Sequence, residues 1–320
     1  MRPANLARPA VAAALMLVAG AAAAADAQTY PTRSIRIITA VPGSGTDLMS
    51  RVIAQGLSTG FGQPAVVDNR GIVGIEVAAK AAPDGYTLLL YTSPLWLMPA
   101  FRSDVSWDVL RDFVPIMAPT VTPNIVVVLT SLPVTSVPEL IAYAKARPGA
   151  LNYGSGSTGS TAHIAGELFK SMAGVDLVRI NFKGTGVGLT AMLAGEVQVM
   201  FPAAGTATPF LKSGKLRALA VTSAQPSALA TGLPTVSASG LPGYESTSLT
   251  GVFAPVQTPA AIVNRLYAEM VRTLSSPEVK ERLFSTGLEV ITLPSGEFAK
   301  FIRSEASRIE KLVKSAKLRE

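Results

Sequence analysis

A glycine- and hydroxyl-rich stretch at residues 154–161 has the residue types of an anion-binding turn. It follows a short apolar run at 150–153, and the apolar residues after it recur at helical spacing. The first turn of a helix has backbone N–H groups without internal partners, and these groups and the helix dipole favour a bound anion. Glycines let a ligand approach the backbone, and hydroxyl groups can also donate. The members selected as ligand contacts are Ser155, Ser157, Thr158, Gly159, Ser160 and Thr161.

A second stretch of the same design lies more than a hundred residues earlier in the chain. Residues 34–40 are predicted to form a strand, 41–46 a turn, and 47–57 a helix with an apolar face, for which Thr46 is a suitable N-cap. Either stretch alone could be an ordinary capped turn between a strand and a helix. Two helix N-termini that face each other across a cleft would clamp an anion. The candidates here are Pro42, Gly43, Ser44, Gly45, Thr46 and Asp47.

His163 and Ser93 are further candidates, and alternatives stay open for Asp47 and His163. An acid at a helix start, such as Asp47, is more often a cap than a ligand contact. His163 is the only histidine, so alone it cannot build a metal site, and no acidic partner for a catalytic triad is evident. We favour a structural role for His163 in holding its loop over direct ligand contact. Ser93 follows a predicted strand, and ligands of α/β sheets bind at strand ends.

Composition limits the classes of protein. A length of 320 residues suggests about two domains, and 48% hydrophobic with 15% charged residues is ample for large cores. The absence of cysteine excludes disulfides, thiol catalysis and cysteine-based metal sites. The net charge is +7, and the basic residues are scattered along the chain. The mild basic cluster at 311–319 has no interleaved aromatic residues. This favours a solvated helix face over a nucleic-acid groove.

Residues 1–27 have the pattern of a secretory signal peptide. Arg2 and Arg8 supply a positive n-region, and the apolar run at 11–24 is too short to span a membrane. Small residues at 23–25 or 25–27 would form the cleavage site. Since no later segment is long and apolar enough to span a membrane, the mature protein is expected to be soluble and exported to the periplasm.

Alternating strand and helix patterns up to residue 221 predict an α/β fold with parallel layers. Residues 92–111, which contain both tryptophans, are predicted to be irregular, either a pocket wall or a surface loop with a buried aromatic anchor. A terminal set of three helices, without a strand between most of them, is expected to pack back on the first domain. The chain would then cross between domains near Thr122 and Leu249. Strands are expected at 34–40, 64–68, 86–91, 114–119, 124–129, 150–153, 177–182, 197–201, 216–221 and 248–254.

Six stretches together resemble one known family. They lie at 30–47, 62–70, 78–90, 151–178, 214–223 and 251–255. The sequence resembles the periplasmic solute-binding receptors of tripartite tricarboxylate transporters, the Bordetella uptake ("Bug") receptors, over nearly the whole mature chain. The resemblance implies a two-domain α/β clamshell like the type II periplasmic binding proteins, with each domain a sheet flanked by helices and the ligand cleft between them.

The same resemblance implies the function and the domain limits. The chain would capture a small carboxylate and deliver it to the membrane permease subunits of a transporter, as a monomer and not as an enzyme. No cofactor, metal or nucleic acid is expected. The expected division is 1–27 for the signal peptide, 28–123 with 253–320 for domain I, and 124–252 for domain II.

The sequence departs from the family at three positions that bear on the ligand. Relatives usually carry an aromatic residue and a second glycine where this chain has Ala40 and Ser44, and a longer Gly-rich loop where it has residues 71–76. In relatives that bind amino acids, an acid after a Met-Phe pair can hold the ligand ammonium, whereas this chain continues from Phe201 to Pro202 without a carboxylate. Because an unpaired buried ammonium is costly, we expect a di- or tricarboxylate, or an aromatic acid, unless Asp47 or Glu76 supplies the charge.

Three other functions share single features with this sequence. Residues 184–188 follow a strand and precede a helix, as a phosphate loop would, but the G-x-x-x-x-G-K-[ST] motif and the later acid are missing. A secreted serine hydrolase lacks support because Ser155 stands where the G-x-S-x-G elbow around Ser157 needs glycine. An exported sensor that signals to a membrane kinase fits the sequence as well as a transport receptor does.

Overall fold

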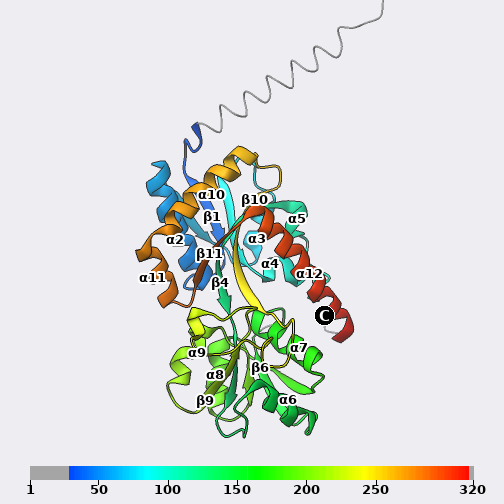
Figure 1. Cartoon of the computed structure of the whole chain (residues 1–320). Helices are drawn as coiled ribbons and strands as arrows, with labels where there is room; N and C mark the ends of the chain where they lie inside the picture. The colour runs from blue at the N-terminus through cyan, green and yellow to red at the C-terminus, as the bar shows by residue number, and fades with distance from the viewer. Residues whose placement is uncertain (1–28, 157, 317–320) are drawn as a thin grey trace, which may run out of the picture.

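The computed structural model describes residues 29–156 and 158–316, so the expected signal peptide and Ser157 lie outside the described residues. Two units, each with its own sheet, are stacked end to end (Figure 1). The first has six strands in the order β11-β4-β10-β3-β1-β2, and the second has five in the order β7-β6-β8-β5-β9. Among the described residues, no helix combines the length and apolar character needed to cross a membrane.

The first unit begins with parallel strands that alternate with helices, as the sequence predicts. The elements are β1 (Ile35–Thr39), α2 (Gly45–Phe61), β2 (Ala65–Asn69), α3 (Val73–Ala79) and β3 (Thr87–Thr92). Strand β1 pairs in parallel with β2 and β3. Because successive side chains of a strand point to opposite faces, Ile37 packs into the core beside α2 while Ile38 packs into the core on the other face.

The segment predicted to be irregular is largely helical. It forms α4 (Pro94–Phe101) and α5 (Val109–Asp112), and Trp96 and Trp107 are both buried. The Trp107 indole N–H donates to the Leu95 carbonyl oxygen at 2.8 Å. A proline in its first turn starts α4, yet its buried residues lie on several sides and Pro99 sits inside it. The one-sided apolar pattern that identifies a helix is therefore absent.

The second unit has a mixed sheet. Its elements are β5 (Ile125–Leu129), α6 (Val137–Lys145), β6 (Leu151–Ser155), α7 (Thr161–Ala173), β7 (Leu177–Asn181), α8 (Thr185–Leu193), β8 (Val199–Met200), α9 (Ala204–Leu211), β9 (Leu216–Val221) and a short 3₁₀ helix, η1 (Ala228–Ala230). Strand β6 pairs in parallel with β7 and β8, but β5 runs antiparallel to β8 and β9. The expected parallel layer is therefore formed by β6, β7 and β8, and β5 alone is reversed relative to the other four strands.

Two long strands connect the units (Figure 1). Strand β4 (Phe113–Pro123) leads out of the first sheet, and β10 (Thr247–Pro255) returns to it and pairs antiparallel with β3 and β4. The boundary expected between residues 252 and 253 falls inside β10, which pairs only within the first sheet over the described residues. Sheet membership therefore puts the return crossing before Thr247.

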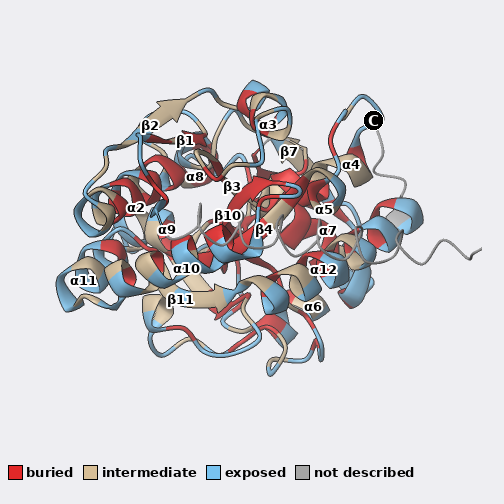
Figure 2. Cartoon of the chain, turned by 90° about the horizontal axis from the view of Figure 1, so that it is seen from above, coloured by how far each residue is buried: buried red, intermediate tan, exposed pale blue. Residues whose placement is uncertain are grey.

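The terminal part of the chain covers the first sheet. It consists of α10 (Ala260–Ser275), α11 (Pro277–Ser285), β11 (Glu289–Pro294) and α12 (Ser295–Ala316). Strand β11 was not expected and adds an antiparallel edge beside β4. Helix α12 packs on α4 and β4, and it also contacts α7 of the second unit. Figure 2 shows buried strands inside helices whose outer sides are exposed.

Candidate functional site

A hollow of about 290 Å³ lies between the two units, and both contribute to its lining. Three helices begin at it: α2 with Gly45, α7 with Thr161, and α9 with the Ala203–Gly205 segment. No ionisable side chain lines the hollow in the part of the chain that the structure describes. The lining residues that carry a hydroxyl or amide are Thr46, Thr92, Thr122, Asn124, Thr161, Thr206, Ser248, Thr250 and Thr286.

The first predicted turn is closed by its own side chains. The Ser44 hydroxyl accepts from the backbone N–H of Asp47 at 3.2 Å, so Ser44 and not Thr46 is the N-cap of α2. The expectation for Thr46 is wrong because the helix begins two residues earlier than expected, at Gly45. Gly45 and Thr46 line the hollow, whereas Pro42, Gly43 and Ser44 do not.

Asp47 lies beneath this turn and supports it. Its carboxylate accepts from the Gly43 backbone N–H at 3.0 Å and the Asn69 amide at 3.0 Å, and it pairs with Arg51 at 3.1 Å. The hydrogen bond from Gly43 is the main cause that holds the pKa of Asp47 below its ordinary value, against the opposing effect of burial. The Gly43 N–H is therefore already engaged, and Asp47 does not line the hollow.

The second predicted turn is held by His163. The Ser160 hydroxyl caps α7 by accepting from the backbone N–H of His163 at 3.3 Å. The His163 Nδ1 accepts from the Gly159 N–H at 3.1 Å, and the ring packs against Phe101 of the first unit, 5.5 Å between centroids. Burial, with a smaller effect from Arg179, lowers the pKa of His163 to about 3. The imidazole is therefore neutral at pH 7.

Arg179, on β7, supports the second turn from behind and was not predicted. Its guanidinium donates to the Ser155 hydroxyl at 2.8 Å, the Thr158 hydroxyl at 3.1 Å and the Gly156 carbonyl oxygen at 3.1 Å. An arginine inside the otherwise apolar strand at 177–181 was the available signal. Among the predicted residues of this turn that are described, only Thr161 lines the hollow.

Helix α9 supplies a third N-terminus that sequence reasoning missed. The Pro202 carbonyl oxygen accepts from the Ile125 N–H at 2.9 Å, so Pro202 fixes the entry to this helix without lining the hollow. No side chain caps α9. Pro209 lies inside this helix and interrupts the sequence pattern that would predict a helix. Ser93 is fully buried at the start of α4 and lies outside the lining, which the adjacent Thr92 joins instead.

Asn124, at the junction of β4 and β5, was also missed. It is fully buried and lines the hollow, and neither polar atom of its side chain has a partner among the described residues. Its backbone is tied on both sides to Thr222: the Asn124 N–H donates to the Thr222 hydroxyl at 2.9 Å, and the Asn124 carbonyl oxygen accepts from the Thr222 N–H at 2.9 Å. A fixed backbone thus presents a free carboxamide to the cleft.

One rim of the cleft is closed by a contact between two backbones. A Cβ atom added to Gly205 of α9 would lie 3.0 Å from the Gly287 Cα, and one added to Gly287 would lie 2.9 Å from the Gly205 Cα. Gly287 follows α11 in the first unit and also has a positive φ of 84°. Both positions therefore require glycine for the units to meet this closely.

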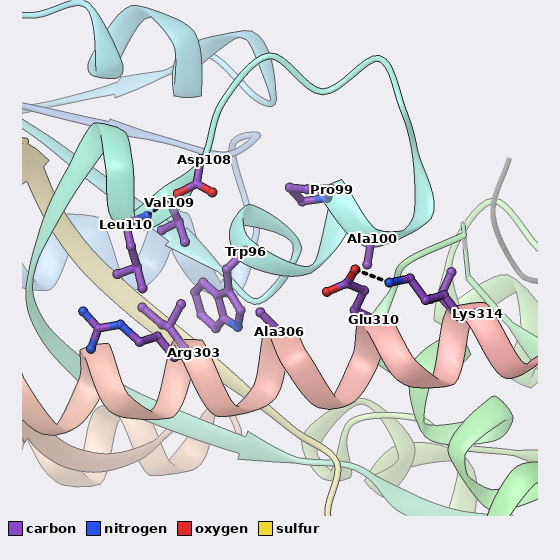
Figure 3. A pocket seen from close by; sticks show the side chains of 12 residues that line it. Trp96, Pro99, Ala100, Asp108, Val109, Leu110, Arg303, Ala306, Glu310 and Lys314 are labelled. Atoms are coloured by element: carbon purple, nitrogen blue, oxygen red, sulfur yellow. Dashed lines mark hydrogen bonds and ion pairs between the residues drawn. The ribbon is translucent and has the colours of Figure 1, made fainter.

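A larger hollow of about 720 Å³ lies away from the cleft, between α4, α5 and α12 (Figure 3). Its charged residues include Asp108, which caps α5, and Glu310, which pairs with Lys314 at 2.7 Å. None of the predicted ligand-contact residues lines it, but six residues of the stretch at 92–111 do, as the pocket-wall alternative for that stretch expected. We place the candidate site in the smaller cleft because residues from both predicted turns meet there.

The arrangement in the cleft suits a bound anion. The first N–H groups of three helices and several neutral hydroxyl groups surround it, and such donors stabilise an anion without a nearby cation. Since the described lining has no ionisable side chain, it offers hydrogen bonds and no acid–base pair.

Known proteins of one family match the chain. The family model described as the tripartite tricarboxylate transporter family receptor matches residues 49–318. BugT of Bordetella pertussis is 34% identical over 297 residues, 91% of each chain.

Solved structures give the same result. The structure of R. palustris Rpa4515 with adipate has a TM-score of 0.75 and 35% identity, covering 90% of this chain and 98% of that one. MatC from Rhodopseudomonas palustris with bound malate has a TM-score of 0.71 and 28% identity, covering 89% and 100%. These neighbours confirm the two-domain α/β fold of a periplasmic binding protein. The chain belongs to the tripartite tricarboxylate transporter receptor family, whose members are periplasmic solute-binding receptors and not enzymes.

Proposed function

We propose that this chain, once exported, captures a small carboxylate between its two units and delivers it to the membrane subunits of a tripartite transporter. The observation that carries the proposal is the meeting of three helix N-termini in a cleft without ionisable side chains in the described lining. The relatives with bound adipate and malate support a dicarboxylate as the class of ligand.

The ligand carboxylate would bind the first N–H groups of α2 and α7. These groups have no intrahelical partner, and Gly45 and Thr161 place them on opposite sides of the cleft. A hydrogen bond to a charged group contributes about 1.5–3 kcal/mol, so a few such bonds give useful affinity without a counter-ion. The hollow of about 290 Å³ lies at the small end of ligand pockets, which span roughly 300–1,000 Å³. A short acid would fill it.

The ligand would lack an ammonium group. No carboxylate follows Pro202, and Asp47 is engaged by Gly43, Asn69 and Arg51. Glu76 is exposed, accepts from the Ser106 hydroxyl and does not line the cleft. Neither acid that could have replaced the missing charge is therefore placed to hold a ligand ammonium.

A thermal-shift panel tests this proposal. Succinate, adipate, malate, citrate and benzoate would be compared with aspartate and glutamate. At about 100 times Kd a ligand stabilises the folded state by about 2.7 kcal/mol, which is a shift of several degrees for a chain of this size. We expect at least one acid without an amino group to stabilise the protein. Stabilisation by amino acids alone would reject the ligand class, and the absence of any shift would reject carboxylate capture.

Delivery to a transporter needs its own test. Deleting the gene for this chain should abolish uptake of the identified acid, and deleting the permease genes should do the same. Uptake that persists without the permease would favour a sensor over a transport receptor.

A further inference from the structure

Asn124 is the one side chain in the cleft whose donor and acceptor groups are both buried and unpartnered among the described residues. Leaving buried polar groups unpaired costs free energy, so such a group points to a partner that arrives with the ligand. The neighbouring residue across the isolated bridge is Ala203, whose side chain offers no polar group. The partner for the carboxamide must therefore come from what fills the cleft.

The position of Asn124 is fixed from behind. Its backbone N–H and carbonyl oxygen are both taken by Thr222, whose hydroxyl also donates to the Ser246 carbonyl oxygen at 2.6 Å. Thr222 thereby ties together the two segments by which the chain crosses between the units. The backbone of Asn124 is therefore held at the cleft.

The chemistry of a carboxamide restricts its partner. Its nitrogen donates and its oxygen accepts, so a group that does both satisfies it best. A ligand carboxylate only accepts, and the helix N-termini already supply donors to it. A hydroxyl both donates and accepts. An ammonium only donates, and no carboxylate lines the described part of the cleft to balance its charge.

We propose that Asn124 is a specificity-determining residue that reads a hydroxyl group on the ligand, so that the preferred ligand is a hydroxycarboxylate. This inference rests on the proposed capture of a carboxylate and names the class within it. The hydroxyl donates to Asn124 Oδ1 and accepts from Nδ2 while the ligand carboxylates bind the helix N-termini. The matching acid with hydrogen in place of hydroxyl leaves Oδ1 without a donor.

Three ligands that differ at one carbon test the proposal by calorimetry: succinate, malate and aspartate, which carry hydrogen, hydroxyl and ammonium. The set adipate, 2-hydroxyadipate and 2-aminoadipate covers a longer skeleton. Because a site built to hydrogen-bond a hydroxyl rejects the analogue without it, we expect the wild type to bind the hydroxy acid at least tenfold more tightly than the plain acid.

Two variants then change the ratio in different ways. Asn124→Ala removes both groups, so the hydroxy and plain acids should bind within about twofold of each other. Asn124→Asp keeps the size and adds a carboxylate, which repels the acids but can hold an ammonium. The ratio of amino acid to hydroxy acid affinity should therefore rise at least tenfold. Asn152→Ala is the matched control, because Asn152 donates to the Glu196 carbonyl oxygen outside the cleft.

The outcomes separate the two proposals. If no acid of either set binds the wild type, carboxylate capture itself fails and the inference falls with it. If acids bind without preference for the hydroxyl, capture stands and the role of Asn124 is overturned, with an ordered water as the partner of its side chain. Folded Asn124→Ala or Asn124→Asp protein with wild-type affinity ratios would also overturn it.

Discussion

The two turns predicted to bind the ligand have similar sequences but are supported by opposite charges. Behind the first turn lies Asp47, a buried carboxylate that takes the Gly43 N–H. Behind the second lies Arg179, a half-buried guanidinium that donates to Ser155, Thr158 and Gly156. One turn thus has a negative charge behind it and the other a positive charge.

This difference shows that two serine-capped helix starts can be supported by unlike side chains. The carboxylate organises the first turn by accepting from the Gly43 backbone N–H, which is then not available to a ligand. The arginine organises the second turn by donating to oxygens, so it takes no N–H group away. Each turn nevertheless has one N–H group engaged, that of Gly43 by Asp47 and that of Gly159 by His163. Both turns therefore contribute to the cleft mainly through the first residues of α2 and α7.

The largest effect is expected from a charge placed directly in the cleft. Gly45→Asp puts a carboxylate at the start of α2, where an acid is compatible with the helix. Two like charges about 4 Å apart repel by several kcal/mol in a partly buried site, so ligand affinity should fall at least about hundredfold. Isothermal titration of the folded variant measures this.

Size and charge can be separated at the same position. A Cβ atom at Gly45 meets only the Leu288 Cδ2 at 3.7 Å, so Gly45→Ala should bind within about threefold of the wild type. Thr161→Asp and Thr161→Ala repeat the pair on the second turn. Normal binding by folded Gly45→Asp would show that the start of α2 takes no part in the site.

A smaller loss is expected when the support of the second turn is removed. Arg179→Met deletes three donors but keeps much of the side-chain volume, so the free energy of unfolding should fall by about 2–3 kcal/mol and ligand affinity roughly tenfold. Arg179→Lys keeps the positive charge but lacks the planar guanidinium, so its losses of stability and affinity should be intermediate. Chemical denaturation and titration calorimetry give the two values.

Arg217 offers the matched control for this variant. It lies on β9 of the same sheet and donates to the Val134 carbonyl oxygen at 2.7 Å, away from both turns. Arg217→Met should lower stability and leave ligand affinity unchanged. An equal loss of affinity in both variants would mean that Arg179 acts through general stability alone.

Much of the fold could be predicted from local patterns. The apolar strand at 216–221 was predicted with the limits that the structure shows, because a short apolar run bounded by turn residues indicates a buried strand. Helices α4 and α9 were missed because each contains a proline and neither has a clear apolar stripe. Strand β11 was missed because it is only partly buried, so its apolar pattern is weak.

The candidate site also has a part that the sequence predicts and a part that it does not. The two turns were found because glycines and hydroxyl residues signal them within a few positions. Asn124 and Arg179 were missed because their roles depend on partners far along the chain: Thr222 for the first, and the turn at 155–158 for the second. No local pattern records which strand ends will meet at a cleft. That information is carried by tertiary packing.

The smallest effect on ligand binding is expected from lowering the pH. His163 has a pKa lowered from 6.5 to about 3, mainly by burial, so between those values the unfolded chain binds a proton that the folded chain does not. The free energy of unfolding should therefore fall as the pH drops from 6.5 towards 3, by up to about 1.4 kcal/mol per pH unit. The pKa of Asp47 is lowered from 3.8, so that carboxylate keeps its contribution until the pH falls below that value. The second turn should then weaken before the first.

His163→Asn can still accept from the Gly159 N–H through Oδ1 but does not titrate. His163 is the only histidine of the chain, so no other histidine contributes to the pH dependence. Urea denaturation from pH 7 to pH 4 should show a shallower decline for the variant, and parallel declines would mean that the folded protein protonates His163 as readily as the unfolded chain does.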